Sequence, residues 1–294
     1  MKNTPGADDN GAGVAALLTI AKIVSQYSFN HTIVFVAFSG EEQGLLGSHA
    51  YAKEAYLENK NIIVELNADM IGHAETLEGG HSIRTPATID AKWITDDILE
   101  INNVYNLSFT NIIQSTINEE GRGGSDYYSF VQYGFESVAF FENEWNPYMH
   151  QPGDDISNVN MSYLLNTTRL IAATIAYLAD IEPRAPQASI ASPRRGYLYF
   201  DGRESKIISD LKTVIIGDIS IWVEIKYNTT SITKTEFYYD DKLVYTDTTP
   251  PFNYHLTTRS LFREHKIKAI IYDDKGNTSN TWITIRYIHP FIRR

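Results

Sequence analysis

The sequence has no cysteine among its 294 residues and no long apolar run. Disulfides, thiolate metal ligands and cysteine nucleophiles are therefore excluded. The longest unbroken apolar stretch, residues 33–38, is far shorter than the roughly 18 residues that a membrane-spanning helix requires. The N-terminal residues lack the charged and then apolar pattern of a signal peptide, so we expect any export signal to lie upstream of Met1 or to be absent.

Basic residues are scarce in the first part of the chain. Residues 1–182 contain 8 Lys and Arg against 24 Asp and Glu, whereas residues 183–294 contain 17 against 12. An acidic surface repels a phosphate backbone, and the basic surplus of the second part is spread along the sequence, so we expect no nucleic-acid partner. Cations are the partners expected for the acidic part.

Helical and strand-like patterns alternate over residues 1–182. Apolar residues recur at helical spacing in four stretches: 11–27, 42–59, 90–104 and 161–179. Short apolar stretches typical of buried strands lie between them, at 31–38, 61–70 and 137–141. This order predicts an α/β domain over residues 1–182, with a mixed, mostly parallel sheet flanked by helices.

The pattern changes after a proline-rich linker near residues 182–188. Short alternating strands follow at 220–227, 235–245, 265–277 and 281–288, with hairpin-like turns rich in Asp and Gly. We expect a small all-β sandwich with immunoglobulin-like topology over residues 188–294, although the cysteine pair of true immunoglobulin domains is missing.

Two pairs of adjacent acidic residues are explained either as helix caps or as ligands of a bound cation. Asp8 and Asp9 precede the first predicted helix, where carboxylates commonly cap helices. Glu41 and Glu42 follow the predicted strand 31–38, and Ser39 with Glu42 fits a capping box. The second pair also lies at the carboxyl end of a strand, where α/β sheets place their ligand sites.

Asp69 and His150 complete the candidate set. Asp69 follows a buried-looking strand, so it is expected to cap a turn, pair with a cation or bind a metal. His150 lies in a loop rich in Pro, Gly and Asp, where a lone histidine is commonly a solvated surface residue. Taken together, the acidic clusters and the histidine supply the oxygen and imidazole ligands of a two-metal hydrolytic centre.

Four motifs resemble, in order and spacing, the co-catalytic dizinc aminopeptidases of metallopeptidase family twenty-eight: PGADDNGAG, SGEEQGLLGS, LNADMIG and YMHQPGDD. The resemblance covers roughly residues 5–180. It implies that Asp8 bridges two zinc ions and that Glu41 is the general base. It further implies that Glu42 and His150 bind one zinc and that Asp69 binds the other. Tyr148 is then expected to face the substrate.

The sequence departs from this family in one respect. Members have an upstream strand that ends in His-x-Asp and completes the zinc site of Asp69, and no histidine here stands in that context. His73 is a conceivable substitute. We expect a fragment of a longer enzyme, or a shortened form that binds one zinc well and the second poorly, and in either case low activity of this chain alone.

The function expected from the resemblance is zinc-dependent hydrolysis of N-terminal peptide bonds, with peptides or proteins as substrates. Two alternatives remain: a non-catalytic protein that uses the peptidase fold for binding, and a relative with carboxypeptidase or glutaminyl-cyclase activity. Six N-glycosylation sequons and the appended sandwich favour an extracellular or cell-surface protein. The sandwich is expected to bind a surface, the substrate or the catalytic domain.

Overall fold

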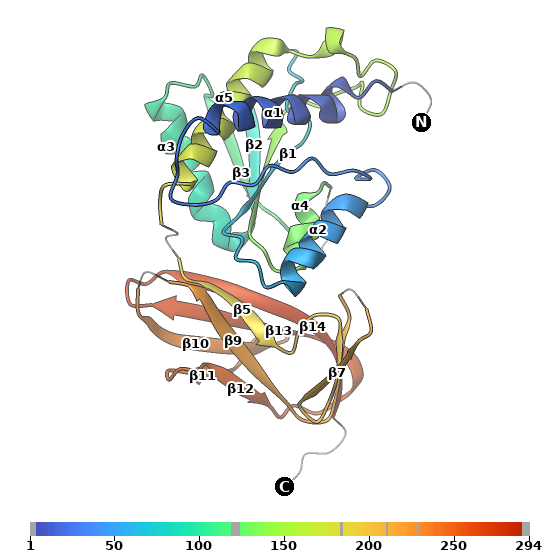
Figure 1. The fold of residues 1–294 in the computed structure, drawn as a ribbon, viewed down its shortest axis with the longest axis vertical. Helices are drawn as coiled ribbons and strands as arrows, with labels where there is room; N and C mark the ends of the chain where they lie inside the picture. Colours follow the sequence, from blue (N-terminus) through green and yellow to red (C-terminus); the bar gives the residue numbers. More distant parts are fainter. Residues whose placement is uncertain (1–3, 119–123, 183–184, 210, 229, 290–294) are drawn as a thin grey trace. The chain divides into compact units, whose positions relative to one another are not determined.

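The computed structural model describes residues 4–118, 124–182, 185–209, 211–228 and 230–289 (Figure 1). The chain divides into two compact units, one of residues 1–52, 64–131 and 135–182 and the other of residues 53–63, 132–134 and 183–294. Residues 183 and 184 of the predicted linker lie outside the described residues. No helix among the described residues combines the length and hydropathy needed to cross a membrane.

The first unit is built on a four-stranded sheet with the order β1-β4-β2-β3. The strands are β1 (Glu65–Ala68), β4 (Ser137–Glu142), β2 (Ser82–Ala87) and β3 (Asn111–Thr116). The pairs β1–β4 and β2–β3 are parallel, whereas β4 and β2 are antiparallel. The mixed, mostly parallel sheet expected from the sequence is confirmed. β2 and β3 have no counterpart among the predicted strands.

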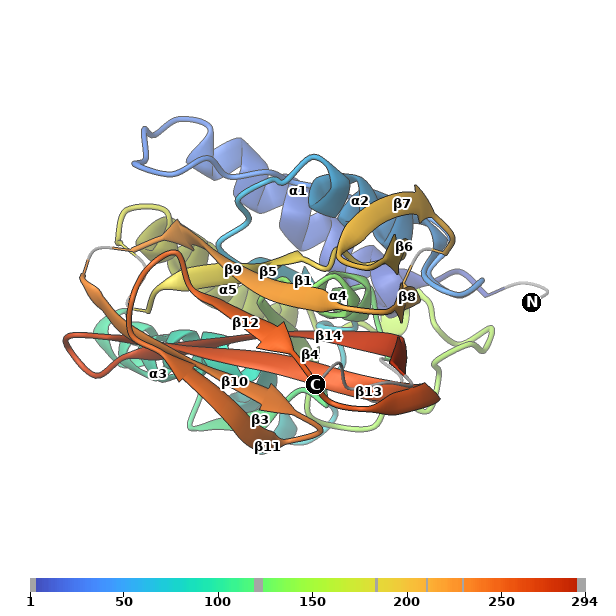
Figure 2. The same cartoon turned by 90° about the horizontal axis from the view of Figure 1, so that it is seen from below.

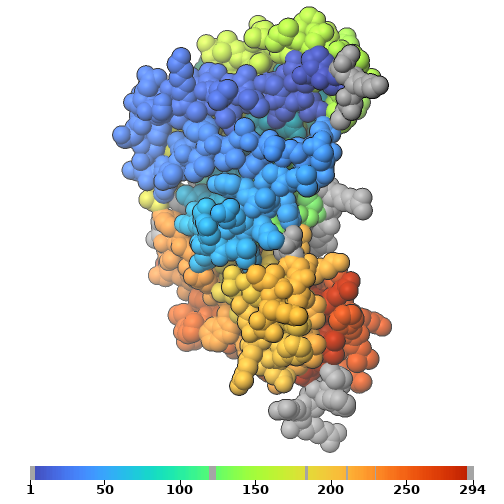
Figure 3. Space-filling model, turned by 45° about the vertical axis from the view of Figure 1, so that its right-hand side comes forward, coloured from blue at the N-terminus to red at the C-terminus, as the bar shows by residue number. Residues whose placement is uncertain are grey.

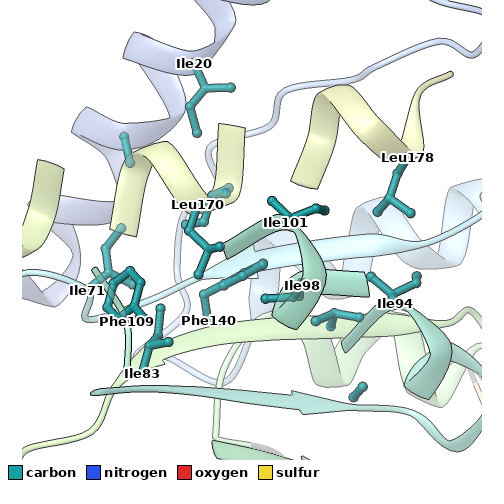
Figure 4. Close-up of a cluster of buried hydrophobic side chains, with 14 of the residues drawn as sticks. Ile20, Ile71, Ile83, Ile94, Ile98, Ile101, Phe109, Phe140, Leu170 and Leu178 are labelled. Carbon is teal, nitrogen blue, oxygen red and sulfur yellow. The ribbon is translucent and has the colours of Figure 1, made fainter. Parts of the chain in front are cut away.

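The α-helices among residues 4–118 and 124–182 are α1 (Gly13–Val24), α2 (Leu46–Leu57), α3 (Lys92–Val104), α4 (Tyr127–Gln132) and α5 (Met161–Leu178). Figure 4 shows Ile20 of α1, Ile98 of α3 and Leu170 of α5 directed toward Phe140 of β4, and all four side chains are at most 1% exposed. Their burial contributes to the apolar stabilisation of the unit. α2 and α4 are linked by the hydroxyls of Ser48 and Ser129, 2.8 Å apart.

The strand predicted at residues 31–38 is wrong. This segment contains no strand, although Ile33 and Phe35 pack against the core while Val34 between them is 63% exposed. The side chains thus alternate as in a strand. A strand also needs a ladder of backbone hydrogen bonds to a neighbouring strand, and among the described residues this segment pairs with none. The backbone N–H of His31 donates instead to the carbonyl of Ala179, which follows α5 (2.9 Å). Figure 3 shows α1 and the segment after it (blue) at the surface.

The second unit contains two packed sheets with the orders β11-β10-β13-β14-β8-β6-β7 and β12-β9-β5 (Figures 1 and 2). Its strands are β5 (Gln187–Ser192), β6 (Tyr197–Phe200), β7 (Arg203–Ile207), β8 (Thr213–Ile216), β9 (Ile219–Tyr227), β10 (Ile232–Tyr239), β11 (Lys242–Asp247), β12 (Asn253–Leu256), β13 (Ser260–Asp273) and β14 (Thr278–His289). Alternate residues of β9, β13 and β14, among them Ile221, Ile267 and Ile283, form its core. The expected immunoglobulin-like all-β region is confirmed. The stretch 235–245 forms the antiparallel hairpin of β10 and β11, with the expected turn at its Asp-Asp-Lys segment.

Candidate metal centre

Asp9 lies in a helical turn, Ala7–Ala12, that precedes α1. The carboxylate of Asp154 accepts the backbone N–H of Asp8 (2.7 Å) and of Asp9 (3.2 Å). The Asn10 side chain donates to the carbonyl of Ala68 at the end of β1 (2.8 Å). These contacts fix the turn against the carboxyl end of β1, the place where α/β sheets present functional side chains.

Asp9, Glu42 and His150 form a cluster in which one ligand atom from each side chain lies within 4.8 Å of the others. The Nε2 atom of His150 is 3.1 Å from Oδ2 of Asp9 and 2.7 Å from Oε1 of Glu42. Within the described part of the chain, this is the group of three candidate ligands that is close enough to hold one ion. Two carboxylates and one imidazole are a donor set that suits zinc.

Asp8, the bridging ligand inferred from the resemblance, is placed elsewhere. Its side chain is 2% exposed, and its oxygens accept the backbone N–H of Gly72 and the side-chain amide of Asn146, each at 2.7 Å. Asp9, which the sequence analysis weighed only as a helix cap, takes the position next to His150. The two neighbours point into different surroundings because the turn at residues 7–12 directs one carboxylate inward and the other toward the cluster.

Glu41 and Glu42 lie in a tight turn rather than in a helical capping box. The carbonyl of Glu41 accepts the N–H of Gly44 (2.9 Å) and of Leu45 (2.8 Å), and α2 begins only at Leu46. Burial, together with the charges of Asp69 and Glu42, raises the pKa of Glu41 to about 7. A carboxyl group with that pKa can accept and return a proton near neutral pH.

Asp69 directly follows β1 and is held by a hydroxyl group. The Ser125 Oγ donates to Oδ2 of Asp69 (2.7 Å) and accepts from the Asn67 side chain (2.9 Å). Burial raises the pKa of Asp69 to about 6, the Ser125 hydrogen bond lowers it, and Asp9 is among the charges that raise it. The carboxylates of Asp69, Glu41 and Asp9 therefore repel one another in the absence of a cation.

His150 stands on an exposed loop in a left-handed backbone conformation, with φ of 60°. Few residues other than glycine adopt this region, so the loop rather than local preference sets the position of the imidazole. The ring of Tyr148 packs edge-on against that of His73. His73 is 2% exposed, and its Nε2 lies 3.9 Å from Glu75 instead of in the cluster.

The residues present fit a bound divalent cation. Burial and the neighbouring charge of Glu42 raise the pKa of Asp9, whereas His150 lowers it, so the imidazole offsets only part of the repulsion in the metal-free cluster. A divalent cation would neutralise this charge and replace the single imidazole as the partner of both carboxylates. Of the predicted site residues, the structure brings together Glu42 and His150, with Glu41 and Asp69 in electrostatic contact with Asp9 or with each other.

Asp154, Asn146 and Ser125 were missed by the sequence analysis. The sequence signal for Asp154 is its position in the motif YMHQPGDD, four residues after the candidate ligand His150. Asn146 and Ser125 carry no charge and stand at no recognisable spacing from the candidate ligands. Only the fold reveals that Asn146 donates a hydrogen bond to Asp8 and that Ser125 donates one to Asp69.

Comparisons with known proteins identify the family of each part of the chain. Residues 1–175 match peptidase family M28, and residues 186–269 match a bacterial Ig domain. A probable zinc metalloprotease of Pyrenophora tritici-repentis is 30% identical over 220 residues, which is 63% of this chain and 50% of that protein. Leucine aminopeptidase 1 of Ajellomyces capsulatus is 27% identical over 189 residues, covering 60% of this chain and 47% of that protein.

A solved structure of a zinc aminopeptidase from Bacillus subtilis superposes with a TM-score of 0.53 and 26% identity, covering 63% of this chain and 45% of that chain. The chain thus spans about half the length of the curated relatives it matches. The family match extends over more than half of the sequence and includes Asp9, Glu41, Glu42, Asp69 and His150. This chain belongs to peptidase family M28 and carries a bacterial Ig domain C-terminal to its peptidase region in the sequence.

Proposed function

We propose that this chain carries the zinc-dependent active site of an aminopeptidase that hydrolyses N-terminal peptide bonds. The observation that carries the proposal is the convergence of Asp9 and Glu42 on Nε2 of His150, at 3.1 and 2.7 Å. Family membership and the names of the relatives, zinc metalloprotease and leucine aminopeptidase, support it.

Asp9, Glu42 and His150 are the residues that would hold the zinc ion. A zinc ion held there would supply Lewis-acid chemistry, polarising the scissile carbonyl and lowering the pKa of a water molecule. Glu41 accepts the proton of the attacking water and delivers it to the leaving amine. Burial and nearby charges raise the pKa of Glu41 to about 7 in the metal-free chain, and a bound cation would lower it. At neutral pH Glu41 would then be ionised and able to accept a proton.

A second zinc ion is proposed near Asp69. Asp9 interacts electrostatically with both Glu42 and Asp69, so it is the carboxylate that would help to hold both ions. Among the described residues, Asp69 is not part of a three-ligand group. We therefore expect the first ion, on Asp9, Glu42 and His150, to bind more tightly than the second.

We also propose an extracellular role in which the Ig domain binds a surface or substrate. The support is the appended bacterial Ig domain. Deleting residues 188–294 should reduce retention on cells or on an insoluble substrate, which a sedimentation assay would measure.

Zinc titration of the purified chain tests the catalytic proposal. Competition with a chromophoric chelator should reveal at least one tightly bound zinc. With zinc present, the chain should release the dye from an aminoacyl anilide with a free amino group, and 1,10-phenanthroline should stop the release. Zinc binding with no cleavage of aminoacyl substrates, but with cleavage of carboxyl-terminal or N-terminal glutaminyl substrates, would assign the alternative activities. No zinc binding would favour the non-catalytic alternative.

A further inference from the structure

The two loops that carry Asp9 and His150 are joined by buried polar side chains. Asp8, Asn146 and Asp154 are 2%, 3% and 1% exposed, respectively. Buried polar groups are stable only when their hydrogen bonds are made, so a fully bonded set fixes the loops that it connects.

Asp154 holds the turn that carries Asp9. Its backbone carbonyl accepts the N–H of Ala7 (3.1 Å), and its two carboxylate oxygens accept the N–H groups of Asp8 and Asp9. Three consecutive N–H groups are thus bound by one residue of the loop that also contains His150. Because Asp154 and Asp9 are distant in sequence, this contact sets the spacing between the two loops.

Asn146 makes the second connection. Its side-chain amide nitrogen donates to Asp8 Oδ2 (2.7 Å). Its side-chain oxygen, Oδ1, accepts the backbone N–H of Tyr148 (2.9 Å), two residues before His150. Asn146 therefore fixes the start of the histidine loop to the residue next to Asp9. Neither Asn146 nor Asp154 belongs to the ligand cluster itself.

We propose that Asp154 and Asn146 are positioning residues. They hold the side chains of Asp9 and His150 close enough together to bind one cation before that cation arrives. The inference rests on the zinc site proposed above. Without these residues, the loops would have to be ordered when the metal binds, and the free energy required would weaken binding. Loss of a residue that orients a ligand typically lowers metal affinity by about 10- to 100-fold.

Zinc affinity of the metal-free, full-length chain tests the proposal. Asp154→Asn keeps the size of the side chain but replaces one acceptor oxygen by an amide that faces a backbone N–H. Asn146→Asp keeps the acceptor for Tyr148 but replaces the donor to Asp8 by a carboxylate. Asp155→Asn is the matched control, because Asp155 is the next residue along and its carboxylate accepts hydrogen bonds from the backbone and side chain of Ser157, within its own loop.

Both test variants should bind zinc about 10- to 100-fold more weakly than wild type, while the control should stay within about twofold. Thermal unfolding of the metal-free proteins, followed by circular dichroism, shows that the variants are folded. Excess zinc should restore turnover, because the ligands and Glu41 remain in place; a purely structural role would leave the affinity of the folded variants unchanged.

Unchanged zinc affinity of folded Asp154→Asn and Asn146→Asp overturns the inference. If Asp154→Asn does not fold, Asn146→Ala decides the question, because it leaves the bonds of Asp154 intact. A wild-type chain that binds no zinc contradicts the proposed function itself, and this outcome is distinct from a wild type and variants that bind equally well.

Discussion

The Nε2 atom of His150 lies 3.1 Å from Oδ2 of Asp9, whereas the carboxylate of the adjacent Asp8 is turned into the protein and bonds to Gly72 and Asn146. Asp9→Asn should therefore weaken zinc binding by about 100-fold or more, because it removes a charged ligand. Asp8→Asn should weaken it by about tenfold or less, because it acts only through the neighbouring loop. Chelator competition on both purified variants measures the difference. A larger loss for Asp8→Asn would support the ligand assignment drawn from the sequence resemblance.

Glu41→Gln should separate turnover from metal binding. Gln cannot accept the proton, so kcat should fall by about 10²- to 10⁴-fold, while zinc affinity should change little. Glu42→Gln is the informative comparison, since it removes a ligand and should lower zinc affinity as well. A Glu41→Gln chain with normal kcat would exclude Glu41 as the general base.

The pH dependence of turnover should follow Glu41 with a definite sign. Burial and the charges of Asp69 and Glu42 raise its pKa to about 7 in the metal-free chain, and a nearby cation favours the charged form. The acid limb of the kcat/KM profile should therefore have its midpoint below pH 7 once zinc is bound. The limb should disappear from any residual activity of Glu41→Gln.

Ser125→Ala should make zinc binding more sensitive to acid. The Ser125 hydrogen bond lowers the pKa of Asp69, which lies at about 6, so its loss raises that pKa and lets protons compete with the metal at higher pH. The affinity should fall more at pH 6 than at pH 8, as measured by zinc titration at each pH. Ser129→Ala is the control, because this buried hydroxyl bonds to Ser48 instead of to a candidate ligand. Equal losses at both pH values would rule out this role for Ser125.

Much of the fold follows from side-chain patterns that are visible in the sequence. The helices α1, α3 and α5 were expected because their apolar residues recur at helical spacing, and each contributes buried residues to the core. In α1 the buried face is Ala16, Ile20 and Val24, whereas Val14 and Leu18 of the expected face are exposed. β2 was missed because Pro86 and Arg84 interrupt its apolar pattern. Residues 31–38 have the alternation of a strand but do not pair with a strand among the described residues, and a local pattern does not reveal strand pairing.

The candidate site was only partly predictable for a related reason. Glu42 and His150 were expected together because several weak motifs coincide, and the structure brings them to 2.7 Å. The choice between Asp8 and Asp9 depends on the path of a single turn, which composition and spacing do not encode. The contacts of Asp154 connect loops that are far apart in sequence, so they become visible only in three dimensions.

Glu142, at the end of β4, is a buried acid that the proposed chemistry does not use. It is 2% exposed, one oxygen accepts the N–H of His73 (2.6 Å), and the carboxyl group shares a hydrogen bond with Asp8. Burial, followed by the charge of Asp8, raises the pKa of Glu142 to about 10. The folded chain therefore keeps a proton at neutral pH that the unfolded chain releases near the ordinary value of 4.5.

The contribution of Glu142 to the free energy of unfolding is fully present below pH 4.5 and is lost as the pH rises toward 10. Glu142→Gln mimics the protonated form, and its amide can donate to Asp8. The variant should be more stable than wild type by about 1–3 kcal/mol at pH 8 in the metal-free state, with little gain at pH 4. Urea unfolding at both pH values measures the gain, and the exposed Glu78→Gln is the control. A Glu142→Gln chain that is less stable than wild type at pH 8 would show that Glu142 is ionised in the folded protein.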